Sequence, residues 1–557
     1  MTQSKMQPPP RSGRPNVPSL VFLSIATALG LVIALLPRTG NQPPPPTVAE
    51  FAPQAAREIR KSQPDQSSNS GDGAGRCEEG QDCSSPEDKE EEPPVIEVPQ
   101  VKQCFGDPPR QTEDPQSPPC MPYFKGENSG ASWQGVTANE IVVALPQVAF
   151  EDPAEIRRLV DSHFNKRYQM YGRKIRIVTF PARGNLNARP DPQQELADAK
   201  DVDEKLQAFA SLSTGGRYGA EHLYYDELAR RQIISIAHRA GAKTEETYLR
   251  RFAPYRWSVL PGIDTMQRHV GEFACNMLKG RPAEHAGPGS NADPRVFGLI
   301  YERSSDGTIP NLDALRGQMS SCGAPFAVDE EYFEGGDANR SATNIMLKLR
   351  QGNVSTVMCF CDNSDVRGSL MQAASAEQYR PEWVLTTYID NDVDNSFSTA
   401  PADQATNVMG VTFRNKLLPR QDMPWYWAYK EDPENPEPPA LNGNPLGARY
   451  SSLLLLASGI QMAGPNLTPE TFEQGLFRAR FPNPGAGAAP YYQARVGFEG
   501  GRHTMIADAA LYWFDPAERG TVDPNSVGAI CYGFQGRRFT LGGWPKVEPP
   551  VFGRCRP

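Results

Sequence analysis

The stretch between Val296 and Tyr388 restricts the fold of this chain more than any other feature, because apolar runs alternate there with amphipathic segments. Four runs have the pattern of buried strands: "RVFGLIY", "PFAVDEEYF", "VSTVMCF" and "EWVLTTY". The segments between them, "IPNLDALRGQMSSCG", "ANRSATNIMLKLRQG" and "NSDVRGSLMQAASAEQY", have the pattern of helices. Strands and helices at this spacing form βαβ units with a parallel sheet covered on both faces. The sequence therefore predicts an α/β fold.

The same alternation begins earlier, after Trp133. "EIVVALPQV" and "RKIRIVTFPA" have strand patterns, and Asp152 and Pro153 suit the N-cap and first position of the helix between them. Helical stretches near 193–201 and 221–231 are followed by the apolar runs "LQAFAS" and "QIISIA". A later apolar helix, 448–464, is too short for a membrane span. We expect the folded region to extend over residues 131–557.

The segment from Val17 to Leu36 is uncharged and has about the 20 apolar residues needed to cross a bilayer. Lys5, Arg11 and Arg14 precede it, so the positive-inside rule keeps residues 1–16 cytoplasmic and places the rest outside. We expect an uncleaved signal anchor and a single-pass protein of the cell membrane, since no A-x-A cleavage site follows the apolar run. A cleaved signal peptide, and hence secretion, is the alternative.

Residues 37–130 are predicted to form a disordered stalk rich in proline and acidic side chains. This segment carries 9 Lys and Arg against 17 Asp and Glu, a net charge of −8 in a chain of net charge −9. Few large apolar residues occur in it, so it cannot bury enough surface to offset its chain entropy. The rest of the chain lacks the basic stripe of a nucleic-acid-binding protein, and we expect no nucleic-acid partner.

The even number of cysteines, 10, indicates disulfides in an exported chain. Cys359 and Cys361 lie in an apparent strand, where alternate residues face the same side, and Cys322 could reach one of them. The pairings stay open at this level. Neighbours along the chain suggest the groups Cys77 with Cys83, Cys104 with Cys120, Cys275 with Cys322, Cys359 with Cys361, and Cys531 with Cys555.

Enzyme motifs are missing from the sequence, which contains no G-x-S-x-G, H-E-x-x-H, Walker loop or G-x-G-x-x-G. The acidic run "DNDVDN", 390–395, resembles the start of a calcium loop, but Asn395 replaces the required glycine and Pro401 replaces the terminal glutamate. We interpret this run as a polar crossover. The sequence therefore predicts a protein that is not an enzyme and that holds no cofactor and no metal.

Several segments, in this order, resemble type I periplasmic binding proteins of the branched-chain amino acid receptor kind. "GVTANEIVVALPQ" and "YGRKIRIVTF" are similar to the family's first two strands, and "FAPYRWSVLPGIDTMQRHVGEFACNMLKG" to its crossover into the second lobe. "NIMLKLRQGNVSTVMCF" and "LLLLASGIQMAGPNLTPETFEQGL" are similar to two further segments. The resemblance covers about Gly135 to Asp515.

The resemblance implies two doubly wound parallel-sheet lobes joined by three crossovers, near Leu260, Asp390 and Val496. Lobe 1 is expected at about 135–260 and 390–496, and lobe 2 at about 261–389 and 497–557. In parallel sheets a ligand contacts residues beyond the carboxyl ends of the strands. Applied here, that rule selects Ser211, Ser213, Thr214, His238, Arg239, Glu302, Arg303, Ser304, Asp362, Asn363, Tyr388 and Asp390.

This chain departs from the family at two places in that set. Where the family uses Ser and Thr to hold an amino-acid carboxylate after the fourth strand, "SIAHRAG" offers His238 and Arg239. The tyrosine expected before a glycine in the second lobe's first loop is replaced by Asp306 before Gly307. Arg239 could bind a carboxylate or another anion in bidentate fashion. The fold can therefore be retained while the ligand differs.

Two classes of function follow from the resemblance. The first is an extracytoplasmic receptor that closes its lobes on a small polar ligand, such as an amino acid, an amide or a related organic anion, and delivers it to an ABC permease. The second is an orphan sensor, or a cell-envelope interaction protein with the same fold and no transport role. The sequence does not name the ligand.

Overall fold

The computed structural model describes residues 114–147, 152–183, 191–212, 221–239, 243–304, 307–335, 338–438, 445–483 and 493–555. The predicted membrane segment 17–36 and stalk residues 37–113 lie outside this set. Among the helices of the described ranges, none combines the length and the hydropathy that a bilayer crossing requires.

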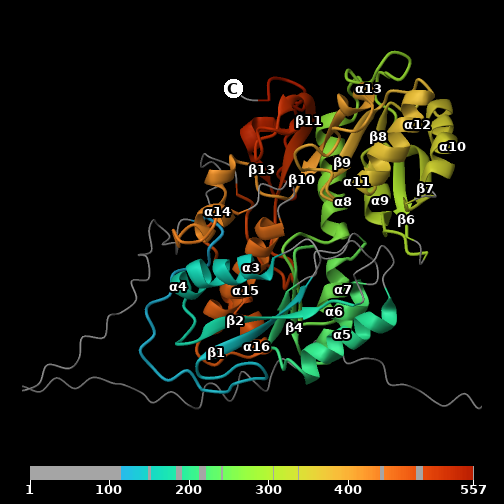
Figure 1. The fold of residues 1–557 in the computed structure, drawn as a ribbon. Helices are drawn as coiled ribbons and strands as arrows, with labels where there is room; N and C mark the ends of the chain where they lie inside the picture. The colour runs from blue at the N-terminus through green and yellow to red at the C-terminus, as the bar shows by residue number, and fades with distance from the viewer. Residues whose placement is uncertain are drawn as a thin grey trace, which may run out of the picture. The chain divides into compact units, whose positions relative to one another are not determined.

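The first sheet contains five parallel strands in the order β2-β1-β3-β4-β5. Figure 1 shows it with helices on both sides. The strands are β1 (Glu140–Gln147), β2 (Lys174–Pro181), β3 (Ala210–Leu212), β4 (Ile234–Ala237) and β5 (Arg256–Ser258). The helices of this part are α3 (Pro153–Leu159), α4 (Asn165–Arg167), α5 (Pro192–Glu204), α6 (Glu221–Arg230), α7 (Glu246–Arg250), α15 (Pro445–Ala463) and α16 (Pro469–Arg478).

Strand β1 explains why this sheet needs helices on both faces. Val142 and Ala144 belong to one hydrophobic cluster, which includes Leu228 of α6. Ile141 and Val143, on the opposite side, belong to another, which includes apolar residues of α15. Because alternate residues of a strand point to opposite faces, a strand with consecutive apolar residues must be covered on both faces.

The second sheet has the order β12-β11-β10-β9-β8-β6-β7, with β13 paired to β11. Its strands are β6 (Phe297–Arg303), β7 (Phe326–Phe333), β8 (Thr356–Phe360), β9 (Glu382–Thr386), β10 (Val408–Thr412), β11 (Ala509–Arg519), β12 (Val527–Tyr532) and β13 (Arg538–Phe539). Its helices are α8 (Ile263–Phe273), α9 (Asp313–Ser321), α10 (Ala338–Gln351), α11 (Asn363–Asp365), α12 (Met371–Ala376) and α13 (Ala402–Ala405). Helix α14 (Pro424–Tyr429) follows β10 in the chain and packs against α3 and α15 of the first-sheet part.

The two sheets repeat one topology. Numbered from its own first strand, each begins with the order 2-1-3-4-5, as β2-β1-β3-β4-β5 in one and β7-β6-β8-β9-β10 in the other. In this doubly wound order the connections reverse direction beside the first strand, and the carboxyl ends of the flanking strands are open to a ligand there. The α/β fold with parallel sheets that the sequence predicts is confirmed.

Strand β10 differs from the expected division into lobes. The sequence assigned 390–496 to lobe 1, whereas Val408–Thr412 pairs with β9 and β11 in the second sheet. The second sheet also ends in antiparallel pairs, β10 with β11 and β11 with β12. The chain therefore leaves the second sheet after β10 and returns to it at β11.

The end of the predicted stalk is packed against the folded part. Asp114 and Ser117 are fully buried, and Gln116 is 3% exposed. The Nε2 atom of Gln116 donates a hydrogen bond to Ala494 O (2.9 Å), and its Oε1 accepts one from Asn415 Nδ2 (2.9 Å). We call residues 114–128 the strap. The sequence assigned these residues to the disordered stalk, whereas the structure packs them on the folded part. Composition could not reveal this, because polar contacts hold the strap.

Three of the suggested cysteine groups form disulfides among the described residues: Cys275–Cys322, Cys359–Cys361 and Cys531–Cys555. The prediction that Cys322 reaches the strand cysteines is wrong. Cys359 and Cys361 project to the same side of β8, as the strand pattern implied, and bond to each other. Cys77, Cys83 and Cys104 lie outside the described residues.

Candidate functional site

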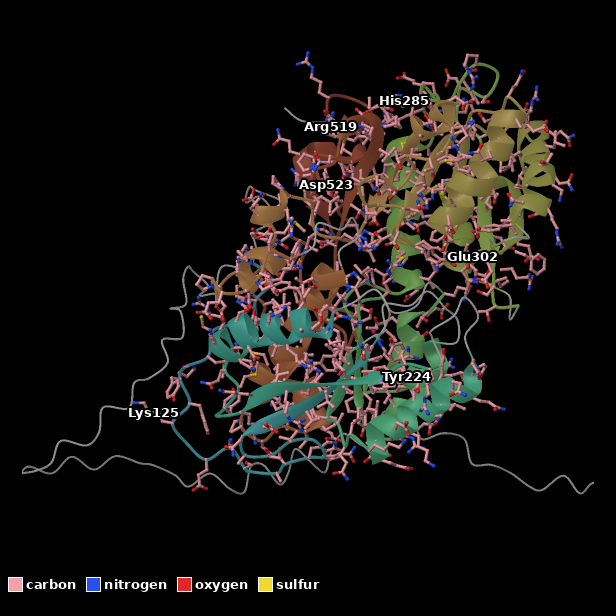
Figure 2. The ribbon with its side chains drawn as sticks, in the orientation of Figure 1. Lys125, Tyr224, His285, Glu302, Arg519 and Asp523 are labelled. Atoms are coloured by element: carbon pink, nitrogen blue, oxygen red, sulfur yellow. A yellow bond between two sulfur atoms is a disulfide. The ribbon has the colours of Figure 1, made fainter. Side chains whose placement is uncertain are left out.

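Polar side chains from the two sheets meet beyond the carboxyl ends of β4, β6, β8, β9 and β10. Arg239, after β4, forms an ion pair with Asp390, after β9. Lys243, between β4 and α7, lies 3.4 Å from Glu302 Oε1 at the end of β6. Figure 2 labels Glu302 on the side of the second-sheet part that faces the first-sheet part. We call this group the candidate site; it consists of His238, Arg239, Lys243, Glu302, Ser304, Asp362, Tyr388, Asp390 and Arg414.

Arginines and aspartates form a network at one end of the candidate site. Arg414 Nη2 donates to Asp390 Oδ1 (2.8 Å), and Arg414 Nε donates to Asp392 Oδ1 (2.9 Å). Burial by itself would raise the pKa of Asp390, but Arg239 and Arg414 outweigh burial and lower that pKa. The "DNDVDN" carboxylates at 390 and 392 thus face guanidinium groups. The run lies between β9 and β10 of the second sheet, so the crossover between lobes that was expected near Asp390 does not lie here.

His238 lies beside this network with both ring nitrogens buried. Within the described residues, neither Nδ1 nor Nε2 has a hydrogen-bond partner. Burial, and then the positive charges of Arg414 and Arg239, lower the pKa of His238 well below its usual value, while Asp390 opposes them. The imidazole is therefore neutral at physiological pH and carries one N–H donor and one acceptor nitrogen.

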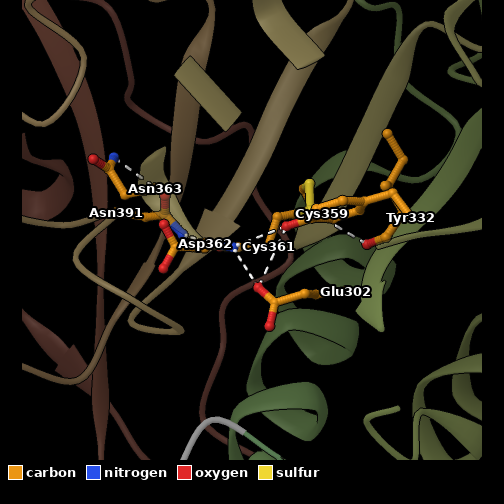
Figure 3. Close-up of a disulfide and its surroundings, with 8 residues drawn as sticks. Glu302, Tyr332, Cys359, Cys361, Asp362, Asn363 and Asn391 are labelled. Atoms are coloured by element: carbon orange, nitrogen blue, oxygen red, sulfur yellow. Dashed lines mark hydrogen bonds between the residues drawn. A yellow bond between two sulfur atoms is a disulfide. The ribbon is translucent and has the colours of Figure 1, made fainter. Parts of the chain in front are cut away.

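Glu302 is the centre of the other end of the candidate site, shown in Figure 3. Its Oε2 accepts hydrogen bonds from the Tyr332 hydroxyl (3.4 Å) and from the backbone N–H of Asp362 (3.2 Å). Burial raises the pKa of Glu302 to about 7; Lys243 opposes this, and Asp362 adds to it. Glu302 therefore changes its charge near neutral pH.

Tyr388 lies after β9, near Glu302 and Asp362. Its side chain is 1% exposed, its ring meets Phe360 edge to face (centroids 6.2 Å apart), and its hydroxyl has no hydrogen-bond partner among the described residues. Burial raises the pKa of Tyr388 well above its usual value, and the charges of Glu302 and Asp362 add to this effect. The hydroxyl stays protonated and can donate a hydrogen bond.

The other predicted positions have local roles or fall outside the described residues. The Ser211 hydroxyl contacts the Tyr224 hydroxyl (2.8 Å) within the first-sheet part, and Arg303 is paired with Glu331 (2.5 Å). Asn363 Nδ2 donates to Ser396 O (3.2 Å) in the loop between β9 and β10. Ser213 and Thr214 lie outside the described residues.

Sequence reasoning missed Lys243 and Arg414. Arg414 follows β10 by two residues, so the strand-end rule would have selected it if "VMGVT" had been recognised as a strand. Lys243 stands six positions after the end of β4, beyond the residues to which that rule was applied. Only its contacts with Glu302, and with Ser304 and Thr308 after β6, show its place in the candidate site.

No protein-family model matches this chain, and no curated protein does. Solved structures with a similar backbone include a solute-binding protein of an ABC transporter from Rhodopseudomonas palustris BisB5, in complex with 3,4-dihydroxybenzoic acid; the TM-score is 0.48 at 8% identity, over 72% of this chain and 98% of that one. An ABC transporter substrate-binding protein from Sphaerobacter thermophilus gives 0.48 at 12% identity, over 73% and 100%.

A leucine-binding protein from Thermotoga maritima gives a TM-score of 0.44 at 12% identity, over 71% of this chain and 97% of that one. These similarities concern the backbone. The strand orders observed in this chain itself, two sheets of order 2-1-3-4-5, give it the twofold doubly wound α/β architecture that the resemblance predicts.

Proposed function

We propose that the protein is an extracytoplasmic solute-binding receptor that closes two lobes on a small polar ligand and delivers it to an ABC importer. One observation carries the proposal. Side chains from the strand ends of both sheets converge, and within the described residues two of them, His238 and Tyr388, bury polar atoms that have no hydrogen-bond partner. Buried polar groups without partners are costly, so a site that keeps them is suited to a ligand that satisfies them.

The chemistry of the candidate site indicates a ligand with both donors and acceptors. The neutral His238 ring offers one of each, the Tyr388 hydroxyl donates, and Glu302 accepts when it is ionised. The guanidinium groups of Arg239 and Arg414 suit an anionic group. An amino acid, an amide or a related organic anion fits this combination.

The proposed location outside the cytoplasm rests on the apolar segment 17–36 and on the disulfides. Cys275–Cys322, Cys359–Cys361 and Cys531–Cys555 are bonds of the kind that persist in exported proteins and are rare in the cytosol. We propose that the segment 17–36 anchors the protein in the membrane and that residues beyond it lie outside the cell or in the periplasm.

A thermal-shift screen of the full-length protein with amino acids, amides, urea and short organic acids tests the proposal. A ligand that binds only the folded state raises the melting temperature, with about 2.7 kcal/mol of stabilisation at 100 times Kd. Titration calorimetry then gives the affinity of each compound that raises it. A screen in which every compound leaves the melting temperature unchanged would contradict the proposal.

Two conservative variants separate binding from stability. Tyr388→Phe removes a hydroxyl without a described partner, so we expect the ligand-free protein to keep its melting temperature and the ligand to bind about tenfold more weakly. Tyr379→Phe removes a hydroxyl that donates to Val354 O (2.8 Å) inside the second-sheet part. This control should lower the melting temperature and leave the affinity unchanged.

The strap favours a second candidate, a tethered sensor without a transporter. Gln116 contacts Asn415, just after β10, and Ala494, near the third predicted crossover. The strap therefore contacts the folded part where the chain passes between the two sheets. Permease and ATPase genes beside the gene for this chain would support import; their absence, together with a ligand found in the screen, would support the sensor.

A further inference from the structure

Lys243 joins the two sheets through a buried polar contact. The residue lies between β4 and α7, in the first-sheet part, and its Nζ atom is 3.4 Å from Glu302 Oε1 at the end of β6. The same Nζ donates hydrogen bonds to Ser304 Oγ and to Thr308 O (3.0 Å), which follow β6. The side chains of Lys243 and Glu302 are only 8% and 5% exposed.

The partners of Lys243 are groups that belong to the candidate site. Glu302 and Ser304 were both selected by the strand-end rule as positions that touch a ligand, and Lys243 approaches them from the other sheet. A solute that uses these groups must therefore share them with Lys243 or displace it. The contact is also direct enough to hold the strand ends of the two sheets together when no solute is present.

We propose that Lys243 is a latch between the two lobes, which closes on Glu302 and Ser304 and competes with the solute for them. This inference rests on the proposed function, because it assigns a regulation to the same site. The latch is electrostatic, so its strength depends on the charge of Glu302.

The groups around Glu302 set the pH at which that charge changes. Tyr332 comes from β7, Asp362 follows β8, Tyr388 follows β9, Glu334 follows β7 and Asp365 lies in α11. Burial raises the pKa of Glu302 to about 7, Lys243 lowers it, and the negative charges of Asp362, Glu334 and Asp365 raise it. All of these groups except Lys243 belong to the second-sheet part.

The direction of the pH effect follows from the charges. Above pH 7 Glu302 is ionised and forms a charge-assisted contact with the ammonium group of Lys243. Below pH 7 Glu302 takes up a proton and loses this charge-assisted contact, while the hydrogen bonds of Lys243 to Ser304 and Thr308 remain. The latch is therefore weaker in acid but is not abolished.

Distances between the lobes test the latch without any ligand. Spin labels are placed on Gln194 of α5 and Asn344 of α10, both exposed, through a non-natural amino acid so that the disulfides stay intact. Double electron–electron resonance is recorded on the full-length protein at pH 8.5 and pH 5.5. We expect the population with the longer label-to-label distance to increase at pH 5.5. The ratio of the long-distance to the short-distance population should change about tenfold, the usual difference between charged and neutral hydrogen bonds.

Two variants test whether the pH-dependent change in distance comes from the contact between Lys243 and Glu302. Glu302→Gln should give the same distribution at both pH values, matching the wild type at pH 5.5. Lys243→Met should show the longer distances even at pH 8.5. Lys205→Met makes the same chemical change at an ion pair with Asp201 within the first-sheet part and should behave as the wild type does.

The proposal is overturned if Lys243→Met keeps the wild-type distances at pH 8.5, or if the wild type gives one distribution at both pH values. Circular dichroism melting confirms that each variant is folded before it is labelled. No solute is present in this experiment, so its outcome is separate from that of the ligand screen. The distance measurement can support the latch even if no ligand is found, and the screen can find a ligand even if the latch is refuted.

Discussion

The Arg295 guanidinium holds the Glu382 carboxylate through two hydrogen bonds, Nε to Oε2 (2.7 Å) and Nη2 to Oε1 (3.0 Å), with both side chains fully buried. Glu382 Oε2 also accepts a hydrogen bond from the Thr356 hydroxyl (2.7 Å). Arg295 precedes β6, and Thr356 and Glu382 begin β8 and β9. The pair therefore ties three strands together at their amino ends, away from the candidate site at their carboxyl ends.

Arg295→Met should destabilise the protein by about 3 to 5 kcal/mol, because it leaves the Glu382 charge buried without its counter-charge. Urea unfolding at pH 7.5 measures the change. Arg316→Met is the matched control, since Arg316 and Asp329 form an ion pair of the same length in which both side chains are one third exposed; its cost should stay below about 1 kcal/mol. Equal costs for the two variants would refute the role assigned to the buried pair.

His269 should make the stability depend on pH. Burial, and then the charges of Arg538 and Arg502, lower the pKa of His269 to about 3, and its Nδ1 accepts a hydrogen bond from Trp544 Nε1 (3.1 Å). The unfolded chain binds a proton at this residue below about pH 6.5, whereas the folded chain does not, so stability is lost as the pH falls. Between pH 7.5 and pH 5 this residue should account for a loss of about 2 kcal/mol.

Urea unfolding of the wild type and of His269→Gln at the two pH values isolates that contribution. The glutamine can still accept from Trp544 but does not titrate. The variant should lose about 2 kcal/mol less than the wild type on acidification. The same loss in both proteins would show that His269 is protonated in the folded state.

The disulfides should differ in their effect on stability. Cys275 and Cys322 are 47 residues apart, whereas Cys359 and Cys361 are 2 residues apart. A cross-link stabilises mainly by restricting the unfolded chain, so the chain-entropy contribution is about 4 kcal/mol for the first bond and about 1 kcal/mol for the second. Double alanine variants, compared by thermal unfolding, should follow this order, and the reverse order would contradict the chain-entropy explanation.

The strap should detach when the contact at Asp114 is weakened. The Tyr450 hydroxyl donates to Asp114 Oδ2 (2.5 Å), and Asp114 is fully buried. Tyr450→Phe removes this hydrogen bond from a buried carboxylate, which should cost about 1 to 3 kcal/mol. Limited proteolysis should then cut within residues 114–128 sooner than in the wild type, while Tyr379→Phe, which lowers stability elsewhere, leaves the strap protected. Equal cleavage in both variants would argue against a specific anchor.

Much of the fold follows from local pattern, as β1 and β8 show. Both strands are apolar in their central residues, and the structure buries alternate residues in two different clusters, one on each face of the sheet. The N-cap at Asp152 was equally readable, since its side chain accepts from Ala154 N. Strand β10 was missed because Gly410 interrupts its apolar pattern. That glycine faces the backbone of Leu385, where a Cβ atom would collide.

The sequence by itself determined most of the strands and helices of the first sheet and of the region from β6 to β9, and it placed His238, Glu302 and Tyr388 at strand ends, because periodicity and capping depend on residues a few positions apart. Tertiary structure decided which of those ends meet. The pairing of Lys243 with Glu302 and of Arg414 with Asp390 joins residues far apart in the chain, and the bond of Cys322 to Cys275 was one of the pairings that the sequence left open for Cys322. Such contacts depend on how whole sheets and crossovers pack, which no local pattern encodes.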